Sequence, residues 1–291
     1  MPILDDRIVR RISAYLVEGN YDSSPCQLSA NAKRSFIGSI ILGMGFTFDD
    51  ENAPKGEASS ILDMQMLLDL HPSLSQKIHP YIGGEEINND PRQLNRRFVF
   101  NISDLSESQA LTGWPQLMEL ARQRVKPKRD PLKRPVYRDN WWRFGEPQTA
   151  LYAAIGNSRH VLAISRVTPH LAFTLLPSDM VYADSTVVMI RANYSLFSVL
   201  QSRPHEVWAR FFSSSMKDDL RYTPSDCFRT FPFPANFETD ATLETAGEAY
   251  HTFRANLMIE RKEGLTKTYN HFHARGENPS DIARCAFSTP K

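Results

Sequence analysis

Two short patterns in the sequence could support metal-dependent chemistry. Glu260-Arg261-Lys262 matches the end of a nuclease-type Asp…Glu-x-Lys motif, and His271-x-His273 offers two imidazoles to a metal ion. The first pattern lies in a segment with helical periodicity and has no suitable aspartate on a preceding strand. The second has no third ligand nearby. We interpret the first as a chance match and the second as exposed histidines, so we predict no catalytic and no metal-ligating residue.

Glycine-rich turns that could bind a cofactor are incomplete. Gly43-Met44-Gly45 lacks the third glycine of a GxGxxG turn and no helix is expected after it, which favours a strand kink over a phosphate loop. The sequence contains no G-x-S-x-G, no Walker lysine loop and no Asn/Asp-Pro-Pro-Tyr/Phe motif of amino-methyltransferases. Asp49-Asp50-Glu51 could hold a cation, although a solvated turn is the simpler interpretation. We predict no cofactor-binding residue in this chain.

Positive charge is concentrated in one segment although the net charge is only +1. Between residues 122 and 143, nine Lys or Arg residues stand against two Asp, among several prolines, and Trp141, Trp142 and Phe144 follow or end the run. Such a run could be a solvated linker. We favour the interpretation that the aromatic end is anchored in the protein while the basic side chains contact a phosphate backbone.

Apolar periodicity predicts a mixture of helices and strands that would position these residues. Three short strands of a β-meander are expected within 160–167, 171–177 and 180–190, and a strand, bend and strand within 31–50. A further strand is expected at 96–102, and another within 7–18. Residues 81–91 and 213–226 are expected to be loops. Helices are expected within 58–72, 114–125, 147–155, 194–202, 203–212 and 243–273, the last with a break near Gly264.

The stretch 203–234 is the densest in unusual residues. Val207, Trp208, Phe211 and Phe212 fall on a helical spacing, which predicts one buried helix face. The alternation Phe231-Pro232-Phe233-Pro234 cannot form a helix or a central strand, so we expect an extended aromatic segment lying on another surface.

Composition limits the class of protein. Three widely spaced cysteines, Cys26, Cys227 and Cys285, do not indicate a disulfide framework or a zinc site. The first residues carry charges where a signal peptide has an apolar region, and no run approaches the roughly 20 apolar residues that span a bilayer. We therefore predict a cytoplasmic protein with no membrane association.

Six segments, in this order, resemble the C-terminal half of MmeI-like adenine-specific DNA methyltransferases of restriction-modification and phage-defence systems. They are FIGSIILGMGFTFDD, YIGGEEIN, the run from VKPKR to WWRFGEP, RVTPHLAFTLLPSDMVYA, LQSRPHEVWARFF and RYTPSDCFRTFPFP. The similarity extends from about residue 5 to about residue 275. The resemblance implies an α+β fold, in which a mixed target-recognition domain with small β-sheets and helices is followed by a helical C-terminal region.

The resemblance also implies a domain organisation. Residues 1–30 would lead in from a missing methyltransferase domain, 31–191 would form the target-recognition domain and 192–275 the helical region, and 276–291 would be an atypical, disordered tail. The cofactor glycines and the catalytic loop of the family are missing from this sequence. We therefore expect a fragment or the product of a split gene, with S-adenosylmethionine bound in the parent enzyme and no cofactor in this chain.

The leading hypothesis is a module that recognises double-stranded DNA and works with a methyltransferase domain or chain. Two alternatives stay open: a subunit of a split, active DNA methyltransferase, and a protein-interaction module of a defence complex. In the first hypothesis the basic segment contacts phosphates, while turns between 159 and 191 read bases, with Arg166 donating to a guanine. The predicted DNA-binding residues are Lys126, Lys128, Arg129, Lys133, Arg134, Arg159, Arg166, His170, Ser178, Arg191, Lys217 and Arg221.

Overall fold

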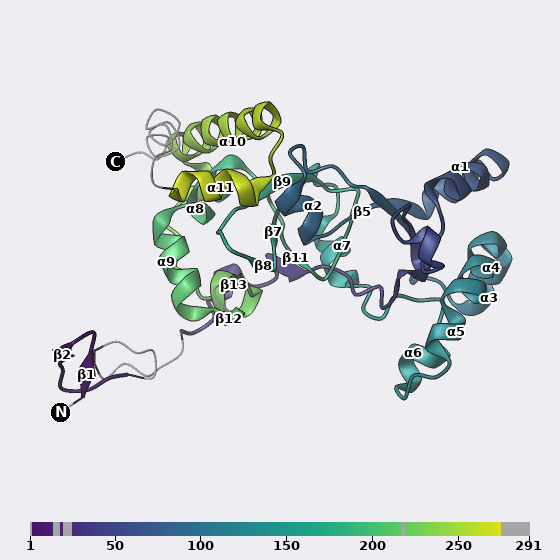
Figure 1. Cartoon of the computed structure of the whole chain (residues 1–291), viewed down its shortest axis with the longest axis horizontal. Coiled ribbons are helices and arrows are strands. Elements are labelled where there is room, and N and C mark those ends of the chain that lie inside the picture. Colours follow the sequence, from purple (N-terminus) through teal and green to yellow (C-terminus); the bar gives the residue numbers. More distant parts are fainter. Residues whose placement is uncertain (1, 14–17, 20–24, 217–218, 275–291) are drawn as a thin grey trace.

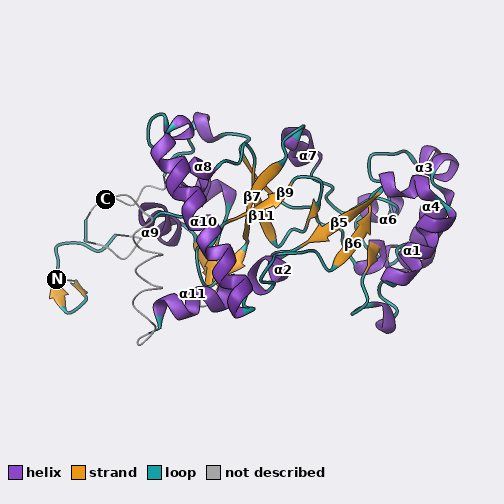
Figure 2. Cartoon of the chain, turned by 90° about the horizontal axis from the view of Figure 1, so that it is seen from above, coloured by secondary structure: helices purple, strands orange, loops and turns teal. Residues whose placement is uncertain are grey.

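The computed structural model describes residues 2–13, 18–19, 25–216 and 219–274. A central antiparallel sheet lies between two groups of elements (Figure 1). One group contains the C-terminal helices, and the other contains a second sheet with the helices α1, α3 and α4. The view from above shows the same succession along the molecule (Figure 2). The α+β class expected from the sequence is confirmed.

The central sheet is buried on both faces. Its strand order is β3-β11-β7-β9, and the strands are β3 (Ser35–Ile37), β7 (His160–Ser165), β9 (Thr174–Pro177) and β11 (Thr186–Met189). Side chains alternate along a strand. Leu162 and Ile164 of β7 therefore enter one core, while Val161 and Ala163 enter the other. This explains why these strands are almost continuously apolar in sequence.

Helices from distant parts of the chain cover the two faces. One face packs against α8 (Tyr194–Leu200) and α9 (Arg203–Phe212). The other packs against α2 (Gly84–Asn89), α7 (Thr149–Ile155) and α11 (Leu265–His273). The long helix α10 (Ala241–Arg261) lies along α8, and Met258 of α10 contributes to the second core.

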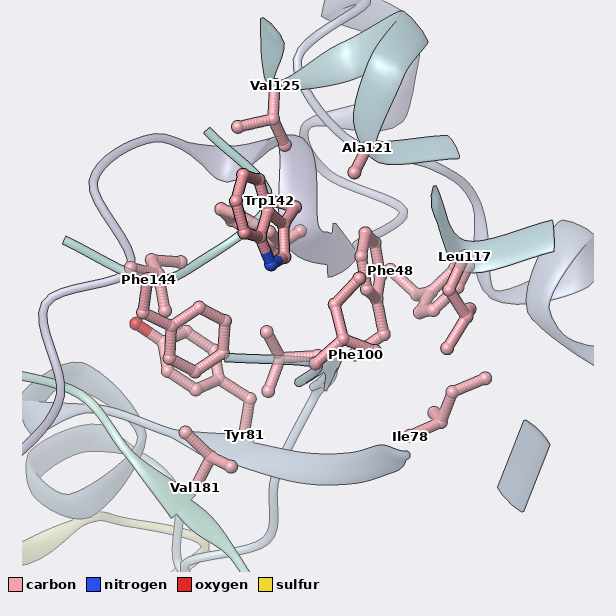
Figure 3. Close-up of a cluster of buried hydrophobic side chains, with 14 of the residues drawn as sticks. Phe48, Ile78, Tyr81, Phe100, Leu117, Ala121, Val125, Trp142, Phe144 and Val181 are labelled. Atoms are coloured by element: carbon pink, nitrogen blue, oxygen red, sulfur yellow. The ribbon is translucent and has the colours of Figure 1, made fainter. Parts of the chain in front are cut away.

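The second sheet has its own core. Its order is β10-β5-β6-β4, and the strands are β4 (Thr47–Phe48), β5 (Ile78–Ile82), β6 (Arg97–Phe100) and β10 (Val181–Tyr182). The helices beside it are α1 (Ile61–Leu70), α3 (Glu107–Gly113) and α4 (Pro115–Arg124). Figure 3 shows how Phe48, Phe100 and Leu117 meet Trp142 and Phe144 in this core. The Ser60–Asp63 and Ser106–Gln109 capping boxes begin α1 and α3.

Short elements complete the described chain. Short strands are β1 (Ile3–Leu4), β2 (Arg7–Ile8), β8 (Val167–Thr168), β12 (Ser214–Met216) and β13 (Asp219–Arg221), and short helices are α5 (Lys126–Arg129) and α6 (Pro135–Asp139). Single turns of 3₁₀ helix occupy Ser29–Asn31, Met44–Phe46, Ala53–Lys55, Pro72–Gln76 and Phe237–Thr239, and a π turn occupies Pro224–Phe228.

Three expectations about the strands and loops are wrong. The segments between 160 and 190 do not form a meander, because β10 leaves to pair with β5 and β11 returns on the opposite side of β7 from β9. Residues 81–91 contain the helix α2 instead of a loop. Residues 213–226 contain the β12–β13 hairpin, and β13 pairs with β8. In each case a contact distant in sequence decides the local structure.

The outer face of α9 also differs from the expectation. Val207 and Phe211 are 53% and 41% exposed, whereas His205 and Ala209 are fully buried. Positions four residues apart share a helix face, so the apolar residues of α9 form two stripes and not one buried face. Trp208 belongs to the inner stripe: it packs edge to face on Phe231 of the proline-aromatic segment, with ring centroids 5.9 Å apart.

The domain boundaries predicted from the sequence stay predictions. Of the lead-in 1–30, the described part holds the β1–β2 hairpin and the turn Ser29–Asn31. The predicted tail 276–291 lies outside the described residues.

The buried imidazole of His205 predicts a loss of stability in acid. Burial lowers its pKa from 6.5 to about 3, and its Nε2 lies 3.0 Å from the Tyr222 hydroxyl. The unfolded chain therefore binds this proton at a pH where the folded chain does not. Above pH 6.5 the imidazole is neutral in both states and protonation costs no stability. As the pH falls from 6.5 toward 3, only the unfolded chain is protonated, so the free energy of unfolding declines by roughly 1.4 kcal/mol per pH unit.

Urea unfolding between pH 7 and pH 4 measures this dependence. The variant His205→Gln is expected to show a shallower slope of unfolding free energy against pH, whatever its stability at pH 7. His251 is present in both proteins, and burial lowers its pKa to about 4, so its contribution cancels in the comparison. Equal slopes in the two proteins would show that His205 is not held neutral.

Candidate nucleic-acid interface

The basic segment folds as two short helices and is anchored at its aromatic end. Helices α5 and α6 follow α4, and the chain then enters the second core through Trp141, Trp142 and Phe144. The Trp142 indole donates to the Leu105 carbonyl over 3.1 Å, and the Phe144 amide donates to the Ser103 hydroxyl over 2.9 Å. The anchoring expected from the sequence is present, while the segment itself is helical.

Most of the positive charge in this segment is engaged by the protein itself. Arg122 pairs with Glu119, Lys126 with Asp130 and Arg138 with Asp139, at 3.2, 2.8 and 3.0 Å. The Arg143 guanidinium donates to the Leu105 carbonyl over 2.8 Å. Three exposed groups have no carboxylate partner in the part of the chain that the structure describes: Lys128, Lys133 and Arg134. They are the groups in this segment best placed to meet an external anion.

Arg129 was predicted to bind DNA, and its position in the structure corrects this prediction. The residue is only 1% exposed. Its guanidinium donates to the carbonyls of Ile41 and Arg143 over 2.9 and 3.3 Å and lies 5.9 Å from the ring centroid of Phe46. Burial lowers its pKa. An arginine enclosed in this way holds α5 onto the core and cannot reach a phosphate on the surface.

The predicted base readers lie at two opposite ends of the central sheet. Arg159 precedes β7, Ser178 follows β9 and Arg191 follows β11, and the strand register places all three at one end. Arg166 follows β7 at the other end. Strands advance about 3.3 Å per residue, so roughly 20 Å separates the two ends. These residues therefore do not form a single reading surface, and Ser178 is already engaged through its hydroxyl with the Ser158 carbonyl.

His170 is held by the C-terminal helix. Its Nε2 lies 2.7 Å from Oδ1 of Asn270, and its ring stacks on those of Tyr269 and His273 at centroid distances of 5.8 and 5.1 Å. This contact joins the loop after β8 to α11. Lys217, which was also predicted to contact DNA, lies outside the described residues.

Arg166 and Arg221 are brought together from positions far apart in sequence. Arg221 of β13 pairs with Val167 of β8, and the Tyr222 amide donates to the Arg166 carbonyl over 2.9 Å. Both residues line an open hollow of about 480 Å³. The Nε atom of Arg166 is buried without a hydrogen-bond partner among the described residues. The hollow is also lined by Gly84, Glu85, Asn88, Asn89, Ser165, Val167, Asp184, Ser185 and Thr266.

Sequence reasoning missed most of this hollow. Glu85, Asn88 and Asn89 come from α2, which was expected to be a loop, and Asp184 and Ser185 come from the turn between β10 and β11. The one signal in the sequence was the pair Gly83-Gly84 at the start of α2, which allows a close backbone approach. Gly84 approaches closely because its amide donates to the Ser185 hydroxyl over 2.9 Å.

A buried ion pair fixes α2 beside the hollow. Glu86 is 1% exposed, accepts from the Gly83 amide over 2.9 Å and pairs with Arg97 at 2.7 Å. Arg97 in turn lies 4.9 Å from the ring centroid of Tyr81. A carboxylate enclosed by a guanidinium and a backbone amide is satisfied, so it orients the helix without needing a ligand.

The acidic turn and the two histidines show no arrangement for a metal ion. Asp49 accepts from the amides of Glu51 and Asn52, and Asp50 accepts from the Ile61 amide, so these carboxylates shape the turn before α1. His271 lies 3.1 Å from Glu263. No group of three or more His, Cys, Asp or Glu side chains suited to a metal ion occurs among the described residues.

Comparison with known proteins places this architecture in a family. The profile described as "MmeI, target recognition domain" matches residues 53–235, which is more than half of the chain. The chain belongs to the MmeI target recognition domain family. The matched region contains the basic segment, both ends of the central sheet and all but one of the residues of the hollow. A search of curated proteins found no match.

A solved structure supports the same fold beyond the matched region. The Type IIL restriction-modification enzyme MmeI in complex with DNA aligns with a TM-score of 0.70 and 17% identity over 97% of this chain. The alignment covers 35% of that enzyme, so the chain spans about a third of its length. The resemblance to MmeI-like enzymes stated from the sequence is confirmed. In the described part of the chain, no helix has the length and apolar character that a membrane crossing requires.

The tight packing of Gly84 predicts that a methyl group will disturb the hollow. A Cβ at this position would lie 2.4 Å from the Ser165 hydroxyl and 3.0 Å from the Ser185 carbonyl oxygen. Gly84→Ala should therefore destabilise the protein by about 1–3 kcal/mol through overpacking. Gly113→Ala is the matched control, because a Cβ there would meet nothing within 4 Å. Urea unfolding compares the two variants, and equal stabilities would contradict the packing described for α2.

Proposed function

We propose that this chain is the sequence-specific DNA-recognition module of a restriction-modification enzyme. The observation that carries the proposal is the family match over 53–235, which spans both the unpaired basic groups and the hollow with two arginines. Its first support is chemical: Lys128, Lys133 and Arg134 are exposed cations without carboxylate partners in the described chain, as phosphate contacts require. Its second support is the aligned MmeI enzyme, whose solved structure is a complex with DNA.

The finer parts of the proposal concern the reaction that the module serves. We place it in an S-adenosylmethionine-dependent, adenine-specific methyltransferase, with the cofactor in a methyltransferase domain or chain and not in this one. A methyltransferase acts on a base flipped out of the duplex, so a separate surface must hold the duplex in register. The recognition module would supply that surface in the cytoplasm, within restriction-modification or phage defence. A split, active methyltransferase would use the same module with its partner chain.

A protein-interaction module is the second candidate, and one observation favours it. Val207 and Phe211 form an exposed apolar stripe on α9, on the side of the central sheet away from the basic segment. The two candidates differ in their response to salt: binding of a duplex through phosphates should weaken steeply as salt rises, and docking through apolar side chains should not.

Salt-dependent binding of the full chain to a random-sequence duplex tests the proposal. A fluorescence anisotropy titration at several salt concentrations is expected to give a linear fall of log affinity with log salt. A chain that does not bind duplex DNA at low salt would contradict the proposal.

Lys128→Ala is expected to weaken binding to all duplex sequences alike and to reduce the salt slope by about 1, because one phosphate contact is lost. Lys126→Ala is the matched control: it removes the same charge from the same helix, but this ammonium is already paired with Asp130. The same anisotropy titrations measure both variants. An effect of Lys126→Ala as large as that of Lys128→Ala would indicate that only the total charge of the segment matters.

Arg166→Ala is expected to act differently, by relaxing the preference for one base pair while the salt slope stays close to that of the wild type. The measurement is competition between duplexes that differ at single positions. If Arg166→Ala and Lys128→Ala had the same effect on all sequences, the division between base reading and phosphate contact would be wrong.

A further inference from the structure

The hollow beside α2 contains unpaired groups of both charges. Arg166 and Arg221 contribute guanidinium groups, and Asp184 contributes a carboxylate. Within the part of the chain that the structure describes, none of these three side chains takes part in an ion pair, whereas the neighbouring Glu85 pairs with Arg96 at 3.1 Å. The two guanidinium groups and the carboxylate lie on one wall of the hollow and do not pair with one another. They are therefore available to a ligand that offers both hydrogen-bond acceptors and a hydrogen-bond donor.

Backbone hydrogen bonds hold these three residues beside one another. The Arg166 amide donates to the Ser185 carbonyl over 2.7 Å, which places the end of β7 against the turn that carries Asp184. The Tyr222 amide donates to the Arg166 carbonyl over 2.9 Å, which brings Arg221 to the same place. The three side chains therefore start from rigid strand ends, and little freedom is lost when they meet a ligand.

The composition of the wall argues against a phosphate as the ligand. A phosphate offers only acceptors and carries negative charge, so Asp184 and the nearby Glu85 would repel it. A stacked, flipped-out base is also a poor fit, because Val167 is the only apolar side chain larger than a methyl group among the lining residues and none is aromatic. The edge of a base pair presents donors and acceptors side by side in the major groove and matches a mixed wall.

We infer that this hollow reads one G·C base pair, with the Arg166 guanidinium donating to guanine O6 and N7 and Asp184 accepting from the cytosine N4 amino group. The inference rests on the proposed DNA-recognition function and deepens it. Arg166 and Asp184 are then specificity-determining residues for the same base pair. Arginine to guanine and a carboxylate to cytosine are the pairings that the geometry of these bases favours.

Selection of bound duplexes from a random pool tests the assignment. The full chain is compared with Arg166→Ala, with Asp184→Ala and with Asp179→Ala, which removes an exposed carboxylate at the opposite end of the central sheet. Wild-type protein is expected to select G·C at one position. Arg166→Ala and Asp184→Ala should both lose that preference at the same position, by about 5- to 150-fold, and Asp179→Ala should keep it.

Each other outcome has a definite meaning. If Asp184→Ala tightens binding to every sequence without changing the preference, the hollow faces phosphate and the inference fails while DNA recognition stands. If the two variants alter different positions, the shared base pair is refuted. If the wild type shows no salt-dependent duplex binding, the proposed function itself fails. Binding of random-sequence duplex with an unchanged salt slope shows that each variant is folded.

Discussion

Burial of the central sheet on both faces is the constraint on which the rest of the molecule depends. Alternate side chains of β7 and β11 enter two separate cores, one under α8 and α9 and the other under α2, α7 and α11. No face of the sheet is left to bind a ligand in the described structure. The central sheet therefore offers polar side chains to a ligand only at its strand ends, where Arg166, Asp184 and Arg221 meet.

The protein neutralises much of its own charge, and this determines which groups remain available. In the basic segment, Arg129 is enclosed as a structural residue and several other cations bind carboxylates or carbonyls of the same chain. Near the hollow, Glu86 is matched by Arg97 and thereby fixes α2. The groups that remain unpaired lie on rigid elements. This suits a module that binds DNA without a change in its own fold.

Local patterns in the sequence predicted the elements whose own side chains decide their structure. The apolar periodicity of α1, α4, α8 and α10 was sufficient to predict these helices. Local sequence patterns failed to predict the secondary structure where a contact distant in sequence determines it. The pair Gly83-Gly84 at the start of α2 is typical of a loop, yet it lets Gly84 pack against Ser165 of β7 and Ser185 of the β10–β11 turn.

The site was predictable only in part, for the same reason. The concentration of basic residues is visible in the sequence, but the burial of Arg129 depends on the carbonyl of Ile41, which lies far away in the chain. Arg166 was a candidate from the sequence and stays a prediction, whereas its neighbour Asp184 was not proposed, because only the order of strands in the sheet brings the two together. Phe211 was expected in the core and is exposed, since the spacing on α9 allows two apolar stripes.

Hydrogen exchange of the full chain with and without a duplex would show which backbone segments the DNA covers. We expect slower backbone exchange in two separate regions on adding DNA: residues 126–138 of the basic segment and the strand ends around Arg166, Asp184 and Arg221. The apolar stripe of α9 should be unchanged. Protection confined to α9, or no protection in either predicted region, would contradict the claim that the strand ends and the basic segment together form the DNA interface.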